Sequence, residues 1–365
     1  MKNVLITPLD WGLGHATRCI PIINELLNRN CNVVIGGSGD SLALLKIEFP
    51  QLTFISLPAY RPVYPLSGSM IWTMLKQLPK FLSTIKKEHD AIERIVKSSR
   101  IDLIISDNRY GCWSSVVPSV FITHQTNILL PKKFKWLNRL VQKLNFFLIK
   151  KFSMCWIPDY PDGRSLSGKL TSLGEKGHLI KVRYIGSLSR FTPRPAKGIL
   201  YDVLCILSGP EPQRTEFERI AVDELLRSGL RHYIVRGIVS EENNPSTTFR
   251  GANFLKGTDL QAIIEQSEYI LARSGYSTIM DLAALGKKAI FVPTPGQTEQ
   301  EYLAARLRTK GIAYSVAQHD FDITKAWNSA HSYTGFNQFP GDVHRLTEAL
   351  HEIVPVNVTQ EIQQI

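Results

Sequence analysis

The stretch from Tyr269 to Pro295 constrains the fold of this chain more than any other. Residues 269–272 form an apolar run typical of a buried strand, and residues 273–277 form a small, polar turn. Good helix formers follow over residues 278–285, then a glycine, then a second apolar run over residues 289–292. A strand, a turn, a helix and another strand in this order predict parallel strands joined by a crossover helix. We therefore expect an α/β protein.

The turn of this unit is a candidate phosphate site. Ser274 and Gly275 come directly before the predicted helix, where free backbone N–H groups and the positive end of the helix dipole favour an anion. Asp281 lies within that helix, where a carboxylate can accept hydrogen bonds from the two hydroxyls of a ribose. The alternative is an ordinary strand–helix–strand unit in which Gly275 only makes the turn.

The N-terminus shows the same order of elements. Residues 4–7 and 31–35 are predicted strands, and residues 16–28 are a predicted helix that follows a glycine-bearing turn. The G-x-G-H pattern of that turn is not the G-x-G-x-x-G of dinucleotide-binding folds. Moreover, Gly36-Gly37 stand where such folds carry Asp or Glu. The sequence therefore excludes NAD binding here.

The segment 274–302 resembles the donor-nucleotide motif of family 28 glycosyltransferases. The resemblance implies the GT-B fold, which is two Rossmann-like α/β domains facing each other across a cleft. It also implies that Ser274 and Gly275 bind the diphosphate of a UDP-sugar and that Asp281 holds the ribose. Asp281 is a departure, because Glu is the commoner residue at this position.

A second element of the family pattern follows at the matching distance. Pro295-Gly296 precedes the acidic and Gln residues Glu299, Gln300 and Glu301. The resemblance implies that Gln300, together with Glu299 or Glu301, binds hydroxyls of the donor sugar.

The resemblance extends to the N-terminal turn. Gly12, Gly14 and His15 match the glycine-rich loop that lines the family's cleft on the acceptor side. A His at a helix N-terminus has its charged form disfavoured by the helix dipole, so His15 is the candidate base for an acceptor hydroxyl. The alternative is that His15 only caps the helix or packs against Trp11.

Three further groups of residues match the family pattern less specifically. Ser208 and Gly209 match a family turn that faces the donor diphosphate, and Arg214 is a candidate to supply charge there because two nearby prolines lack N–H groups. Polar residues that end two predicted strands are expected on the acceptor side: Asp107, Asn108, His124 and Asn127. The last two fit a His-x-x-Asn of the family, although His124 is equally consistent with a structural role in the cleft wall.

We expect two domains and a terminal segment. Residues 1–185 are the predicted acceptor-side domain and residues 186–340 the predicted donor-binding domain, after a Gly/Ser/Pro-rich linker. Residues 341–365 are predicted to form a C-terminal helix and tail that cross back to the first domain, as is common in this fold.

Charge is unevenly distributed along the chain. Residues 1–185 carry 25 Lys and Arg against 12 Asp and Glu, whereas residues 186–365 carry 18 against 20. The segment 132–152 is basic and has apolar residues at helical spacing, which is typical of a helix in a membrane interface. Lys132, Lys133, Lys135 and Trp136 are the candidate contacts with an anionic membrane. The alternative is that the apolar stripe packs on the sheet. Nucleic acid is not an expected partner, because no known scaffold with exposed aromatics appears.

Other features narrow the class of protein. The chain has neither a long apolar run nor a signal-peptide pattern, so we expect a cytoplasmic protein, peripheral on the inner face of the membrane. Five scattered cysteines argue against a disulfide framework or a zinc site. Asp320-Phe321-Asp322 has the form of a metal-binding D-x-D, but it is read as a solvated turn. No metal or other cofactor is expected.

These observations predict a metal-independent glycosyltransferase. It would move a hexose or N-acetylhexosamine from a UDP-sugar to an acceptor hydroxyl, and the resemblance implies a lipid-linked or cell-envelope acceptor. Two alternatives stay open: a UDP-sugar epimerase of the same fold, and a non-catalytic protein that binds nucleotide sugars or anionic lipids.

Overall fold

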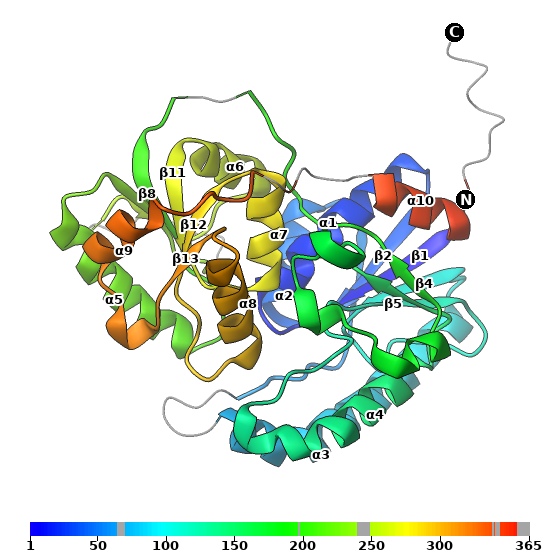
Figure 1. Cartoon of the computed structure of the whole chain (residues 1–365). Coiled ribbons are helices and arrows are strands. Elements are labelled where there is room, and N and C mark those ends of the chain that lie inside the picture. The colour runs from blue at the N-terminus through cyan, green and yellow to red at the C-terminus, as the bar shows by residue number, and fades with distance from the viewer. Residues whose placement is uncertain (64–69, 196–197, 239–248, 338, 340–343, 356–365) are drawn as a thin grey trace, which may run out of the picture.

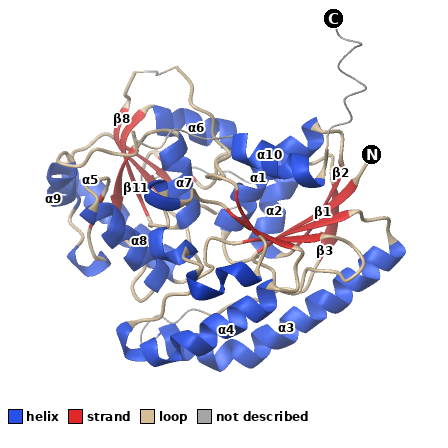
Figure 2. Ribbon diagram, turned by 45° about the vertical axis from the view of Figure 1, so that its right-hand side comes forward, coloured by secondary structure: helices blue, strands red, loops and turns tan. Residues whose placement is uncertain are grey.

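The computed structural model describes residues 1–63, 70–195, 198–238, 249–337, 339 and 344–355, and contains two parallel β-sheets. Figures 1 and 2 show the two sheets side by side, each with its own helices. The predicted α/β class and the paired Rossmann-like arrangement are thereby confirmed. Parallel strands need crossover helices, and this is why strand and helix alternate along most of the chain.

The first sheet has seven strands in the order β3-β2-β1-β4-β5-β6-β7. Their bounds are β1 Asn3–Pro8, β2 Asn32–Gly37, β3 Thr53–Ser56, β4 Leu103–Asp107, β5 Ser119–Ile122, β6 Met154–Ile157 and β7 Val182–Tyr184. Strands β1 and β4 are central and completely or nearly completely buried. Because the chain order reverses between β1 and β4, the carboxyl ends of these two strands border a crevice, which is where α/β sheets bind ligands.

The second sheet has six strands in the order β10-β9-β8-β11-β12-β13. Their bounds are β8 Tyr201–Ile206, β9 His232–Val235, β10 Gly251–Ala252, β11 Ser267–Ala272, β12 Lys288–Phe291 and β13 Tyr314–Ser315. The two apolar runs of the opening motif are β11 and β12, which pair in parallel as predicted. The order reverses again between β8 and β11, so both sheets have a crevice.

Helices cover the faces of both sheets. The α-helices are α1 Leu13–Asn28, α2 Gly39–Glu48, α3 Met70–Ser98, α4 Asn138–Ile149, α5 Gln213–Ser228, α6 Gly257–Glu265, α7 Tyr276–Ala284, α8 Thr298–Thr309, α9 Ile323–Ala330 and α10 His344–Ile353. The 3₁₀ turns are η1 Lys132–Leu137, η2 Asp162–Arg164, η3 Gly168–Thr171, η4 Gly174–Leu179 and η5 Gln318–Asp320. Helix α1 begins earlier than predicted, because Gly12 takes a positive φ of 83° and turns the chain directly from β1 into the helix.

The structure shows two features of the first domain that local sequence rules do not indicate. Prolines usually end or kink a helix, but α3 begins at Met70 and continues through Pro79. Residues 132–152 were expected to form one helix, but the chain makes the turn η1 before α4 begins at Asn138. Helices α3 and α4 lie side by side below the first sheet in both views (Figures 1 and 2).

The C-terminal helix α10 packs on the first domain, beside α1. Arg29 of α1 donates to the carbonyl oxygens of Thr347 and Val354, at 2.9 and 3.1 Å. Lys2 donates to the carbonyl of Ile353 at 2.7 Å. Residues 341–343 and 356–365 of the predicted terminal segment lie outside the described residues.

Candidate active site

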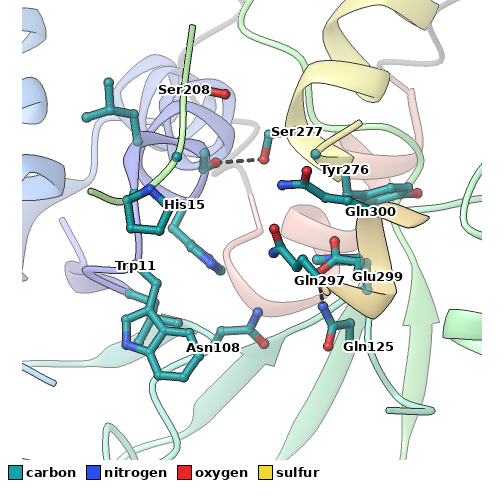
Figure 3. A pocket seen from close by; sticks show the side chains of 18 of the residues that line it. Trp11, His15, Asn108, Gln125, Ser208, Tyr276, Ser277, Gln297, Glu299 and Gln300 are labelled. Carbon is teal, nitrogen blue, oxygen red and sulfur yellow. Dashed lines mark hydrogen bonds and ion pairs between the residues drawn. The ribbon is translucent and has the colours of Figure 1, made fainter. Parts of the chain in front are cut away.

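A cleft of about 680 Å³ is lined by residues of both domains. Figure 3 shows side chains of the first domain, including Trp11, His15 and Asn108, facing Gln297, Glu299 and Gln300 of the second. The loops after β1, β4 and β5 supply one wall, and the start of α7 and the segment before α8 supply the other. The cleft therefore lies where the two crevices of the parallel sheets meet.

His15 lies in the first turn of α1, beside a buried ion pair. Arg18 and Asp107 form that pair, with Arg18 Nε donating to Asp107 Oδ2 at 2.5 Å. Arg18 Nη2 lies 2.8 Å from His15 Nδ1, whereas Asp107 Oδ1 lies 3.4 Å from the same nitrogen. Because a guanidinium has only donors, the shorter contact requires His15 Nδ1 to accept, which places the proton of the neutral ring on Nε2.

Burial and Arg18 together keep the imidazole of His15 neutral. They lower the pKa of His15 below 6.5, and Asp107 only partly opposes them. Burial tends to raise the pKa of Asp107, but the neighbouring Arg18 outweighs it and brings the pKa to about 2. His15 is therefore uncharged at neutral pH, beside a carboxylate that stays ionised.

A second set of polar contacts crosses the cleft. His124 Nδ1 accepts from Arg18 at 3.0 Å, so His124 donates through Nε2 to Glu299 Oε1 at 2.7 Å. Gln125 donates to the other oxygen of Glu299. The ring of His124 stacks on Tyr276, with centroids 4.4 Å apart. Burial tends to raise the pKa of Glu299, but His124 and then Arg18 hold it below its usual range.

Helix α7 begins at the cleft without a side-chain cap. Its N-cap residue Gly275 lines the cleft, and a Cβ built there would meet nothing within 4 Å. Ser277 donates to the carbonyl of Gly14 at 2.9 Å, which brings the first turns of α1 and α7 together. The cap residue and the first turn of α7, residues 275–278, line the cleft, and an uncapped helix start in a cleft is a candidate anion site.

The other residues predicted for the donor diphosphate and ribose divide into two groups. Ser208, Gly209 and Asp281 line the cleft, and Asp281 accepts from Ser189 at 2.8 Å. Burial raises the pKa of Asp281 to about 6, although Arg190 opposes the shift. Ser274 is fully buried and donates to the carbonyl of Gln300 at 2.8 Å, so its hydroxyl positions α8.

Arg214 does not line the cleft. Its guanidinium donates to Glu211 at 2.7 Å and to Glu218 at 2.6 Å. Both carboxylates lie within four residues of it, so local ion pairs on α5 and the preceding turn take up the charge that was expected to face the diphosphate.

The three residues predicted to bind the donor sugar differ in placement. Glu299 and Gln300 line the cleft, and Gln300 Oε1 accepts from the N–H of Thr294 at 2.8 Å. Glu301 does not line it: the side chain is exposed and accepts from the N–H of Gly296 at 2.8 Å. Side chains two positions apart in an α-helix point to nearly opposite sides, so Glu299 and Glu301 lie on different faces of α8.

On the acceptor side the structure brings together most of the predicted residues. Gly12, Gly14, Asn108 and His124 line the cleft with His15, while Asp107 lies buried behind them. Asn127 does not line the cleft, because it donates to the carbonyl of Lys169 at 2.9 Å. The polar ends of β4 and β5 thus meet the start of α1, as the topology requires.

The predicted membrane contacts lie on η1, away from the sheets. Lys133 and Lys135 are exposed, and Trp136 is 76% exposed. The side chain of Lys132 lies outside the described part of the chain. The apolar stripe at helical spacing consists of Phe134, Leu137, Val141, Leu144 and Leu148, and of these only Phe134 is buried, whereas Leu144 is 37% exposed. Phe146 and Ile149, outside the stripe, are buried.

The sequence prediction missed Arg18 and Gln125. Arg18 lies three residues after His15 on α1, so the two side chains share a helix face, and this spacing was a usable signal. Gln125 approaches Glu299 only through the closure of the two domains, and no local pattern indicates that contact.

Two findings concern the whole molecule. None of the helices in the described ranges combines the length and the apolar character that a membrane span requires. Within the same ranges, no group of three or more His, Cys, Asp or Glu side chains is placed to hold a metal ion.

Comparison with known proteins agrees with this geometry. Residues 234–329 match the model of the glycosyltransferase family 28 C-terminal domain. An uncharacterized glycosyltransferase of Methanosarcina acetivorans is 24% identical over 337 residues, covering 85% of this chain and 84% of that protein. The UDP-N-acetylglucosamine–N-acetylmuramyl-(pentapeptide) pyrophosphoryl-undecaprenol N-acetylglucosamine transferase of Wigglesworthia glossinidia brevipalpis is 23% identical over 349 residues, covering 88% of this chain and 87% of that protein.

A solved structure shares the fold over nearly the whole chain. The spinosyn rhamnosyltransferase SpnG, solved in complex with thymidine diphosphate, superposes with a TM-score of 0.63 at 15% sequence identity, covering 97% of this chain and 96% of that one. The chain is thus a glycosyltransferase with the GT-B fold, and residues 234–329 of its second domain are similar to the family 28 C-terminal domain.

Proposed function

We propose that the protein transfers a hexose or N-acetylhexosamine from a UDP-sugar to a hydroxyl of a lipid-linked or cell-envelope acceptor, without a metal ion. The observation that carries the proposal is the position of His15 across the cleft from the uncapped start of α7. The printed name of the Wigglesworthia relative, which pairs a UDP-sugar with an undecaprenol-linked acceptor, supports this choice of substrates.

The donor would lie against the second domain. Backbone N–H groups at Gly275 and the first turn of α7, together with the Ser208-Gly209 turn, would bind the diphosphate. Asp281 would accept from the ribose hydroxyls, and Gln300 would contact the sugar. These donors are in place before the leaving diphosphate gains charge, so they would stabilise it as a metal ion does elsewhere.

His15 would act on the acceptor. Its Nε2 takes the proton of the acceptor hydroxyl, the acceptor oxygen forms the bond to C1 of the sugar, and the bond from C1 to the diphosphate oxygen breaks with its electron pair on UDP. This role needs a lone pair on Nε2 and therefore the proton on Nδ1. Asp107 is the acceptor that would hold that tautomer once Arg18 Nη2 moves away from the ring.

The place of action we propose is the cytoplasmic face of the membrane, where the protein would be peripheral. The exposed Lys133, Lys135 and Trp136 support it, because basic and aromatic side chains together bind anionic interfaces.

The test begins with ligand binding. UDP, UDP-glucose, UDP-galactose and UDP-N-acetylglucosamine are added to the full chain, and the melting temperature is measured with and without EDTA, since a ligand that binds the native state raises it. Turnover of the best donor is then followed with and without an acceptor extract. Release of UDP that depends on the acceptor, resists EDTA and disappears in His15→Ala is the expected result.

Other outcomes would identify the alternatives. A UDP-sugar that changes into its epimer without any acceptor would indicate an epimerase. Binding of UDP-sugar with no turnover under any condition would indicate a binding protein. Turnover that His15→Ala leaves intact would remove His15 from the reaction.

A further inference from the structure

Beside His15, the cleft continues away from the donor site into the space between α3 and α4. Apolar side chains of both helices line this part: Leu78, Phe81 and Leu82 of α3, and Val141, Leu144 and Leu148 of α4. We call it the α3–α4 channel. It belongs to the same cavity as His15 and Asn108, so a ligand can occupy the channel and reach the reaction centre together.

The channel walls contact the reaction centre directly. Phe81 packs on Trp11, with ring centroids 5.4 Å apart, and Trp11 precedes the glycine turn that carries His15. Asn145 of α4 donates to the carbonyl of Gln125 at 3.1 Å, and the side chain of Gln125 bonds Glu299. The two helices therefore hold the loops that carry the candidate acceptor-side residues.

The outer end of the channel opens on an apolar surface. Leu78, Leu82 and Leu144 line the channel and are still 37–43% exposed. Leu140 and Phe147 lie on the exposed side of α4, at 64% and 59%. Large apolar residues that gather on a surface mark a place of contact with an apolar partner.

The charge around this opening indicates which partner. Residues 70–87 and 131–151 carry 4 and 7 Lys or Arg, 11 in total, and no Asp or Glu. The whole chain has 43 basic and 32 acidic residues, so its net charge of +11 equals the charge of these two segments, and the rest is balanced. Basic and apolar side chains on paired helices complement an anionic lipid surface.

We propose that the α3–α4 channel binds the hydrocarbon chain of a membrane-resident acceptor, and that the acceptor's hydroxyl-bearing head lies at His15. This inference rests on the proposed transferase function. The chain leaves the membrane at the opening between Leu82 and Leu144, and apolar walls receive it because they remove its CH₂ groups from water. The bound hydrocarbon chain thus positions the hydroxyl at His15. The basic and apolar surface around the opening binds the membrane in which the acceptor resides.

The test uses 2-bromo-1-undecanol, whose bromine lies beside its hydroxyl and quenches tryptophan on contact, so that in the proposed pose the bromine lies at the end of the cleft that Trp11 and His15 line. Binding to the full chain is followed by Trp fluorescence below the solubility limit of the alcohol. Quenching that is lost in Trp11→Phe and kept in Trp136→Phe would place the chain inside the cleft. Shorter bromoalcohols should bind about four-fold more weakly for each CH₂ removed.

Two leucines of α4 provide matched variants. Leu144 lines the channel and Leu140 does not, and both are exposed enough to accept a carboxylate without unfolding. Leu144→Asp should weaken binding of the bromoalcohol at least ten-fold, and Leu140→Asp should change it less than two-fold. The melting-temperature shift given by UDP should be the same in both, because neither residue lies near α7.

Three results would overturn the proposal: equal effects of the two substitutions, affinity independent of chain length, or tighter binding of the compact 2-naphthol than of the C11 chain. The last would mean that the channel takes ring systems. A different result would separate the two proposals. If the bromoalcohol binds as expected but UDP does not raise the melting temperature, the proposed UDP-sugar donor is wrong and the hydrocarbon subsite is still supported.

Discussion

Arg18 Nη2 lies 2.8 Å from His15 Nδ1 and bonds Asp107 at the same time, so the guanidinium stands between the imidazole and the carboxylate that would orient it as a base. In this arrangement His15 offers a donor, Nε2–H, to the cleft. A base needs the opposite tautomer. Arg18 is therefore the residue that decides whether His15 donates or accepts a proton.

Replacing Arg18 with Met should raise the pKa of His15. Burial and Arg18 lower that pKa and Asp107 raises it, so the variant loses one of the two main lowering influences and keeps the raising one. A base must be unprotonated, so the acid limb of the pH profile of kcat/KM should move to higher pH. The measurement is NMR titration of the His15 ring, which needs no substrate, together with that profile.

The same variant should also be less stable, by about 3–5 kcal/mol, because the fully buried Asp107 loses its partner. Arg18→Met combined with Asp107→Asn removes both charges and should recover much of that loss. An unchanged or lowered pKa of His15 in the single variant would contradict the role given to Arg18.

Substitution of Glu299 should impair catalysis, whereas substitution of Glu301, two residues later on α8, should not. Glu299→Ala breaks the contacts with His124 and Gln125 that join the two domains, so KM for the donor should rise and kcat should fall at least ten-fold. Glu301→Ala removes one hydrogen bond to Gly296 from a side chain that does not line the cleft, and should change neither constant more than two-fold. Similar losses in both variants would mean that α8 as a whole, rather than Glu299, is responsible.

Replacing Asp281 with Asn should stabilise the free protein and weaken UDP binding. The folded pKa of about 6 lies above the ordinary 3.8, so the contribution of Asp281 to stability is complete below pH 4 and is lost as the pH rises through 6. At pH 7.5 the Asn variant escapes that cost, which is at most about 3 kcal/mol.

Melting curves at pH 4.5 and 7.5 should therefore diverge for wild type and variant only at the higher pH. The affinity for UDP, measured by calorimetry, should fall because an amide accepts from the ribose hydroxyls less strongly than a carboxylate. A variant with equal melting temperature and equal affinity would show that Asp281 has neither role.

Membrane contact is tested by charge reversal. Lys133→Glu with Lys135→Glu should reduce cosedimentation with vesicles that contain anionic lipid, by roughly 1 kcal/mol for each lysine lost. The control reverses two exposed lysines of the second domain, Lys256 and Lys310, which gives the same net charge. If both pairs reduce binding equally, general charge rather than η1 is responsible.

Much of the fold follows from local sequence, because buried parallel strands are short apolar runs and a turn with small residues precedes helices such as α1, α2 and α7. The strands β1, β2, β11 and β12 were predicted for this reason. The N-terminal half of helix α3 is harder to predict from local sequence, because Pro79 lies within it and prolines usually end or kink a helix.

The site was predictable in part, for a physical reason. His15, Gly275 and Asp281 were proposed from a family resemblance that lies within single strand–turn–helix units, so each could be placed in the cleft without knowing the other domain. The contacts of Glu299 with His124 and Gln125 join residues more than 170 positions apart, and only the closure of two domains brings them together. Arg214 shows the reverse case, because ion pairs within four residues decide its orientation.

Gly14 determines how near the two halves of the molecule can come. A Cβ at this position would lie 2.9 Å from Ser277 Oγ, closer than such atoms tolerate. Even one methyl group on residue 14 would act as a spacer and keep α7 from seating on α1. The distance between the facing walls of the cleft thus depends on a single hydrogen atom, the one that stands where every other amino acid has carbon.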